Sequence, residues 1–290
     1  MSKLSKKHHY LPEFYIKGFT NTSNHLYVYN KRKDIISKRP LAPGGIFYEI
    51  DANTIEWMGE KNSELEDIHY RQIDDNFSKL ITIFRFEEDV NSLFTPENKI
   101  ALSLFFISLF WRIPVTERLA MHLIKNTTLS FNRETNNPYL SAIENKGYKD
   151  DPSFLKVARA AMFFETVKQL SESSDELAYY RKIDFPQRTL LLGDFPMLYE
   201  KLPMNFDDLY LLDYIFPISS TRIITRTRKE LKPMTIDSQI PINLSIIHQS
   251  TTYVTSTNYD FLKCMVEYYQ GLSVLGELDA NLQNTFNYKI

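Results

Sequence analysis

The chain has 290 residues and a formal net charge of −2, with 43% hydrophobic and 24% charged residues. This composition is typical of a folded domain and excludes collagen-like and linker-like chains. Because the charges are nearly balanced, the sequence does not favour long-range attraction to bulk nucleic acid or to an anionic membrane. The single cysteine, Cys264, excludes an intrachain disulfide and a multi-cysteine metal site.

The N-terminal region predicts strands. Residues 26–29 alternate as a strand does, residues 30–34 form a turn, and residues 35–38 can return as its partner. The basic start, residues 1–7, is followed by His8 to Tyr10 and not by an apolar core, so it is no secretory signal. We therefore expect a cytoplasmic protein.

Long helices are predicted in the middle of the chain. Ser63 and Glu66 have capping-box spacing at the start of one helix, and Thr95-Pro96 begins another. The stretch 100–113 is nearly all apolar but too short to span a bilayer, so it predicts a buried core helix that Pro114 kinks or ends. Residues 136–152 predict a surface excursion, and 153–170 a further helix capped by Asp151.

The last third predicts strands again and then a closing helix. Residues 188–192 and 215–227 are rich in β-formers, and a helix over 259–270 begins at Asn258 and stops at Gly271. The whole pattern predicts one integrated, helix-dominated α+β domain over residues 1–290. Its small, mostly antiparallel sheet joins the N-terminal and C-terminal strands.

Residues 6–19 have the sequence KKHHYLPEFYIKGF. This closely resembles the opening signature of a bacterial family known as domain of unknown function 4238, in which a basic residue precedes HYVPQFYL and a Phe follows. Later segments are similar in the same order: WRIP at 111–114, LGDFPM at 192–197, FPIS at 216–219 and the asparagine at 243. The resemblance implies an integrated fold over nearly the whole chain, and it loosely associates the chain with mobile elements and phage defence.

Three polar residues of these motifs are candidate catalytic groups. His9 could act as a general base or metal ligand, or could pin the N-terminus by hydrogen bonds. Asp194, at the end of a predicted strand, could orient a catalytic group or bond the backbone of its own turn. Arg112 could clamp a phosphate, although a structural salt bridge to Asp194, Asp74 or Glu66 is the favoured interpretation.

Tyr15 and Arg222 are weaker candidates for a substrate-binding, phosphate-facing surface. The sequence specifies no cofactor. A divalent metal stays open, although the sequence lacks the dense carboxylate cluster that metal nucleases generally need. Glycine-rich nucleotide loops and nucleophile elbows are absent from the sequence.

Two classes of function remain. One is a nuclease or phosphodiesterase-like effector of a defence or toxin system, acting on nucleic acid or a nucleotide. The other is a non-catalytic sensor or protein-interaction module, in which the aromatic N-terminal segment contacts a protein partner. The deciding observation is whether His9, Arg112 and Asp194 converge around an open pocket.

Overall fold

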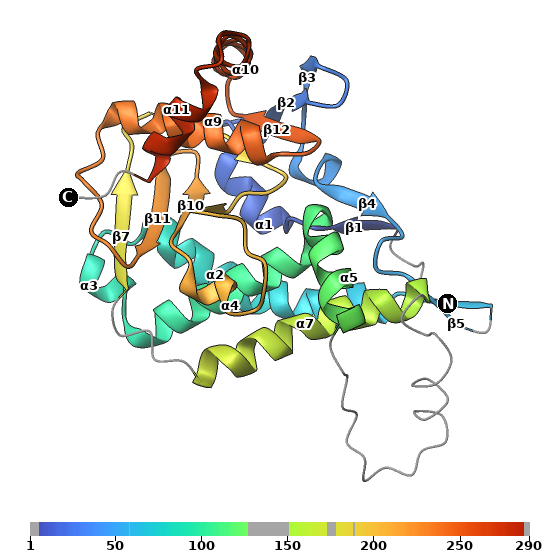
Figure 1. Ribbon diagram of the computed structural model, residues 1–290. Coiled ribbons are helices and arrows are strands. Elements are labelled where there is room, and N and C mark those ends of the chain that lie inside the picture. Colours follow the sequence, from blue (N-terminus) through green and yellow to red (C-terminus); the bar gives the residue numbers. More distant parts are fainter. Residues whose placement is uncertain (1–5, 58, 127–150, 173–177, 188, 287–290) are drawn as a thin grey trace.

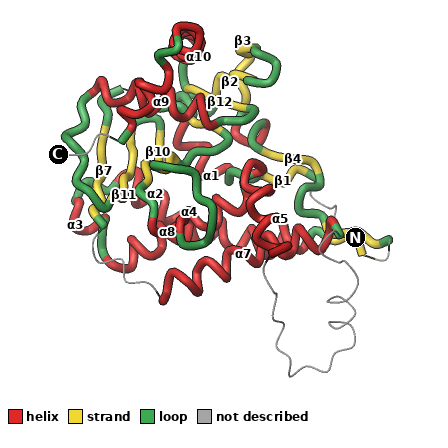
Figure 2. Tube along the Cα trace, viewed as in Figure 1, coloured by secondary structure: helices red, strands yellow, loops and turns green. Residues whose placement is uncertain are grey.

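The computed structural model describes residues 6–57, 59–126, 151–172, 178–187 and 189–286. Helices lie on both sides of the central strands (Figures 1 and 2). On one side are α2 (Arg71–Phe86), α4 (Pro96–Arg112), α5 (Glu117–Asn126) and α7 (Pro152–Glu172), and on the other are α9 (Gln239–Gln249), α10 (Tyr259–Leu275) and α11 (Leu278–Leu282). The short helices are α1 (Glu13–Ile16), α3 (Val90–Leu93) and α8 (Asp208–Leu211).

The described strands form two four-stranded antiparallel sheets and two short ribbons. One sheet has the order β3 (Ile35–Leu41), β2 (Leu26–Asn30), β12 (Tyr253–Ser256), β8 (Leu192–Gly193). The other has the order β7 (Tyr179–Asp184), β11 (Arg222–Thr227), β10 (Tyr214–Ser219), β9 (Leu198–Tyr199). The ribbons pair β1 (Lys7–His9) with β4 (Tyr48–Ile50), and β5 (Ile55–Trp57) with β6 (Glu60–Asn62).

The hairpin β10–β11 is buried on both faces. Successive strand residues point to opposite sides, so Phe216 and Ile224 join the core beneath α4, whereas Ile215 and Ile223 join the core beneath α9 and α10. Phe106 of α4 meets Phe216 edge-on, with ring centroids 4.4 Å apart. The sheet therefore holds the two helical layers together.

The α+β class and the pairing of N-terminal with C-terminal strands are confirmed, since Val28 of β2 lies opposite Thr255 of β12. That the chain forms one domain stays a prediction. The strands form two sheets and not one, since the hairpin β10–β11 pairs with β7 and not with the N-terminal strands. The strand β7 is charged, and its Arg181 and Lys182 form ion pairs with neighbouring acids.

Three local predictions are wrong. Ser63 donates a hydrogen bond to Asp67 and does not form a capping box with Glu66; the helix opens instead with a π-helical segment, Leu65–Tyr70. Of the predicted strand 188–192, only Leu192 among the described residues is in a strand, because the Asn243 amide binds the backbone of residues 189 and 191 at 2.8 and 2.9 Å.

The closing helix also continues past Gly271. It ends at Gly276, whose φ of 73° only glycine adopts readily. Of the predicted surface excursion at 136–152, residues 136–150 lie outside the part of the chain that the structure describes.

The central helix α4 matches its prediction. Thr95 accepts a hydrogen bond from the Asn98 amide at 3.3 Å, and the helix ends at Arg112, two residues before Pro114. In the described part of the chain, no single helix is long and apolar enough to cross a membrane; α4 and the helical segment after it meet that test only as a pair, bent by 75°.

Candidate functional site

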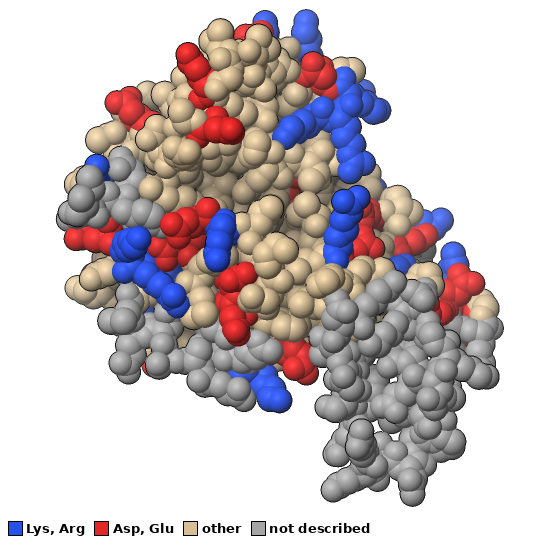
Figure 3. Space-filling model, in the orientation of Figure 1, with Lys and Arg blue, Asp and Glu red and all other residues tan. Residues whose placement is uncertain are grey.

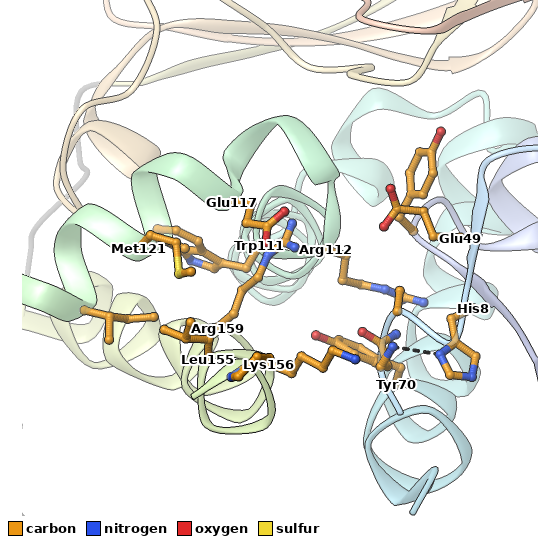
Figure 4. Close-up of a pocket in the computed structure, with 16 residues that line it drawn as sticks. His8, Glu49, Tyr70, Trp111, Arg112, Glu117, Met121, Leu155, Lys156 and Arg159 are labelled. Carbon is orange, nitrogen blue, oxygen red and sulfur yellow. Dashed lines mark hydrogen bonds between the residues drawn. The ribbon is translucent and has the colours of Figure 1, made fainter. Parts of the chain in front are cut away.

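A pocket of about 430 Å³ lies where α4, α5 and α7 meet the ribbon β1–β4, and we call it the central pocket (Figure 4). Its apolar part comes from the three helices, with Trp111, Met121 and Leu155 among its residues. Its polar part includes His8, Tyr10, Glu49, Asn53, Tyr70, Arg112, Glu117, Lys156 and Arg159. A volume of this size suits a small molecule.

Arg112 forms one wall of the central pocket. It is 7% exposed, and its guanidinium binds the Asp74 carboxylate (Nη2–Oδ2 3.3 Å), donates to the His9 carbonyl at 2.8 Å and lies 4.5 Å from the centre of the Tyr70 ring. Burial opposes the charged form, but Asp74, with smaller contributions from Glu66 and Tyr70, opposes burial and the pKa of Arg112 is raised. The structure therefore contains the predicted salt bridge, and its partner is Asp74.

Arg159 of α7 lies on the same pocket but is not neutralised. Its Nη2 donates to the Ile113 carbonyl, and its Nε is buried without a partner. Among the residues that the structure describes, no carboxylate lies within 4.0 Å of its guanidinium. Burial lowers the pKa of Arg159, and the more distant Tyr70, Glu117 and Glu49 offset this only in part. A partly buried cation in this situation is stabilised by an anionic ligand.

Lys156, one helical turn before Arg159, ties the pocket to a neighbouring loop. Its ammonium group donates to the Asp51 carbonyl at 3.1 Å and to the Thr54 carbonyl at 2.8 Å. In the same loop, the backbone N–H of Asn53 donates to Nδ1 of His8 at 2.8 Å, which fixes the orientation of that imidazole (Figure 4). The polar end of the pocket is therefore held in place before any ligand arrives.

Tyr70 is the last residue of the π-helical segment. π-Helical turns often occur at functional sites because they shift the residues that follow around the helix. Here the ring of Tyr70 lies beneath Arg112, and burial raises the pKa of its hydroxyl although Arg112 acts in the opposite direction. Tyr70 thus stays a neutral phenol that supports the arginine.

The two adjacent histidines face different cavities, as the alternation of a strand requires. His8 is buried and lines the central pocket. His9 lines a second cavity of about 410 Å³, which we call the His9 hollow, together with Lys7, Glu13, Gly44, Glu66, Asp67, Arg71 and Asp74. The Nε2 of His9 is 3.9 Å from Glu13 Oε1, too long for a hydrogen bond, and no other residue in the described part of the chain bonds to it. Burial lowers the pKa of His9, which Glu13 only partly offsets, so the imidazole is neutral at pH 7.

Asp194 does not line either cavity. Its side chain accepts hydrogen bonds from the backbone amides of Thr251, Thr252 and Tyr253 at 2.8, 2.6 and 3.1 Å, and from the Thr251 hydroxyl at 3.0 Å. The carboxylate therefore orders the turn before β12. The three predicted catalytic residues therefore do not converge around one pocket: the Arg112 guanidinium touches only the backbone carbonyl of His9, the two side chains line different cavities, and Asp194 lines neither.

The two predicted substrate-binding residues are occupied within the fold. Tyr15 is fully buried and donates to the Pro217 carbonyl at 2.7 Å. Arg222 is 5% exposed, and its guanidinium is bound by Asp184 and Glu88. Neither side chain presents the phosphate-facing surface that the sequence suggested, because Tyr15 packs inward from α1 and Arg222 pairs with acids on neighbouring elements.

Several pocket residues were missed from the sequence: Glu49, Tyr70, Glu117, Lys156 and Arg159. They come from four separate segments, and none stands in a recognisable motif. For Arg159 a signal was present, since the residue stands in the apolar stretch VARAAMFF at 157–164, where a cation needs a partner. Within the described residues, no group of three or more His, Cys, Asp or Glu side chains is arranged to hold a metal ion.

The fold and the pocket define an α+β protein with a small, partly basic cavity beside its N-terminal ribbon. The chain matches the family described as "Protein of unknown function (DUF4238)" over residues 7–264, and it belongs to that family. The resemblance of residues 6–19 is thereby confirmed. No curated protein and no solved structure matches the chain.

Proposed function

We propose that the protein binds a small phosphate-bearing ligand in the central pocket. The observation that supports this most directly is the guanidinium of Arg159, which has no carboxylate partner among the described residues and lines the same pocket as Arg112. Guanidinium groups recognise phosphate oxygens through paired N–H donors, and they do so best when partly desolvated.

The pocket favours a small ligand over a long nucleic acid. Its lining is about half apolar in character, with Met121 and Leu155 facing the same space as the cations. On the face drawn in Figure 3, basic side chains gather at the upper right with acidic ones beside them and alternate with acidic ones elsewhere, so no continuous basic track crosses this face. A polynucleotide-binding groove needs such a track, because most of its affinity comes from contacts with the phosphate backbone.

Calorimetric titration tests this proposal with AMP, the dinucleoside monophosphate ApA and, as an uncharged control, adenosine. We expect at least one phosphate-bearing compound to bind about tenfold or more tightly than adenosine. Arg159→Met should remove that difference, whereas Arg118→Met, an exposed arginine of α5 outside the pocket, should leave it unchanged. Lys156→Met is a second pocket variant if Arg159→Met does not fold.

The proposal fails if neither phosphate compound binds more tightly than adenosine. It also fails if the pocket variants bind as the wild type does.

A second candidate function, hydrolysis of a phosphodiester, is favoured by two carboxylates. Glu49 and Glu117 are exposed and line the same pocket as Arg159. A carboxylate beside a bound phosphate can activate a water molecule as a general base. His9, the base suggested by the sequence, lies in the other cavity and would act on a ligand bound there.

Incubation with ApA, RNA and DNA, with and without divalent metal ions, tests the hydrolytic function. Cleavage that Glu117→Gln abolishes would assign the reaction to the central pocket, and cleavage that only His9→Ala abolishes would assign it to the His9 hollow. If the wild type cleaves none of these substrates but binds one of them, the sensor function is supported. A role in defence predicts that phage infection or overexpression gives a phenotype that depends on Arg159.

A further inference from the structure

We infer that the ligand of the central pocket is a phosphodiester, bound with its phosphate in the middle of the pocket and an organic group on each side. This inference rests on the proposed function and names the class of phosphate compound. It follows from the order of the side chains along the pocket and from its charge.

The cations lie between two different ends of the pocket. Figure 4 shows Met121 and Leu155 at one end, His8 and Glu49 at the other, and Arg112 and Arg159 between them. A phosphate held by the arginines therefore has space on both sides. A terminal phosphate, as in a nucleoside monophosphate, would leave one of the two ends empty.

The two ends suit different groups. The end formed by α5 and α7 is lined by Ala120, Met121, Ile124 and Leu155, with the Trp111 ring behind, so it matches a flat or apolar group such as a nucleobase. The opposite end contains His8, Glu49 and Asn53 at the ribbon β1–β4, and it matches the hydroxyl groups of a sugar.

The charge of the pocket also fits a diester. Arg112, Lys156 and Arg159 line it together with two carboxylates, Glu49 and Glu117, and Arg112 is already paired with Asp74. With Asp74 included, the three positive charges are matched by three carboxylates, so the pocket has no formal positive surplus. A diester carries a single negative charge, whereas a monoester carries between about 1.5 and 2 at pH 7, so the monoester meets more repulsion from the carboxylates.

The order of affinities for ApA and AMP tests this inference. Attraction to cations alone predicts that AMP, with the larger charge, binds more tightly. We expect the reverse, with ApA binding about tenfold more tightly than AMP in calorimetric titrations. Methyl esterification of AMP, which turns its monoester into a diester of lower charge, should raise its affinity toward that of ApA.

Substitutions at the two ends provide the matched variants. Met121→Gln at the apolar end and Glu49→Ala at the polar end should each weaken ApA binding several-fold, whereas AMP should respond to only one of them. Arg118→Met should change neither affinity. If AMP binds more tightly than ApA and both still depend on Arg159, the pocket takes a terminal phosphate and the inference is wrong, although the proposed function stands. If neither compound binds, the proposed function itself fails.

Discussion

Replacing Asp194 by alanine should destabilise the protein without affecting the central pocket. The carboxylate is 4% exposed and accepts four hydrogen bonds from the turn at residues 251–253. Thr251 is exposed, so water can replace its two bonds after the substitution. The amides of Thr252 and Tyr253 remain, and bonds to a charged acceptor contribute about 1.5–3 kcal/mol each. Taking the lower figure for both, we expect a loss of about 3 kcal/mol.

Urea denaturation followed by circular dichroism measures this loss of unfolding free energy. In thermal unfolding, a loss of that size should lower the melting temperature by roughly 6–12 °C in a chain of this length. Asp194→Asn keeps the volume and one acceptor oxygen, so it should lie between the wild type and Asp194→Ala. Asp75→Ala, which removes an exposed carboxylate from α2, is the control and should change stability by less than about 0.5 kcal/mol.

The reasoning about Asp194 is refuted by either of two results. One is an unfolding free energy for Asp194→Ala within about 1 kcal/mol of the wild type. The other is a variant of normal stability that has lost ligand binding or cleavage, since that would mean that Asp194 takes part in binding or catalysis.

Three further variants each test one buried contact or one buried titratable group of the fold. Asp74→Asn leaves the Arg112 charge buried and unpaired, so equilibrium unfolding should show a loss of about 3 kcal/mol or more; an unchanged value would mean that the ion pair contributes little. Gly193→Ala places a methyl group against the Ser250 hydroxyl and 3.3 Å from the Ile246 carbonyl, so it should lower the unfolding free energy by about 1–3 kcal/mol in the same assay. An unchanged unfolding free energy would mean that the turn shifts to make room for the methyl group. Burial, and to a lesser degree Arg112, lowers the pKa of His69 below 6.5, so its protonation is disfavoured in the folded state and stability should fall as the pH drops below about 6.5. His69→Gln should reduce that fall in denaturation curves measured at pH 7 and at about pH 5.5, and an identical fall in both proteins would contradict it.

The sequence predicted the elements whose signals are local. The Thr95 cap and the apolar run of α4 lie within one helix, and the hairpin β2–β3 depends on a short turn between two alternating segments. It did not predict β7, because Arg181 and Lys182 resemble a solvated stretch until Glu230 and Glu88 are brought beside them from distant parts of the chain. Charge neutralisation by tertiary contacts leaves no periodic signal.

The same limit explains the candidate site. Arg112 was found because a guanidinium at the end of an apolar helix needs a partner, which is a local contradiction in the sequence. Arg159 stands in an apolar stretch of α7, VARAAMFF at 157–164, so the same contradiction was present there, but that this residue forms the wall of a pocket becomes visible only when α4 and α5 pack against α7. The π-helical segment that presents Tyr70 depends on a shift in backbone hydrogen bonding that side-chain spacing does not encode.

The N-terminal motif acquires a structural meaning from the strand β1. Because the strand is extended, His8 faces the central pocket and His9 faces the other cavity, and Arg112 lies between them with a hydrogen bond to the His9 carbonyl. That bond is made by the backbone, so His9→Ala retains it and leaves the wall of the central pocket intact. Any loss of activity in His9→Ala must then come from the imidazole itself, whose neutral Nε2 has no partner in the His9 hollow. Comparing His9→Ala with Arg159→Met therefore separates the two cavities, since each variant removes a group that faces only one of them.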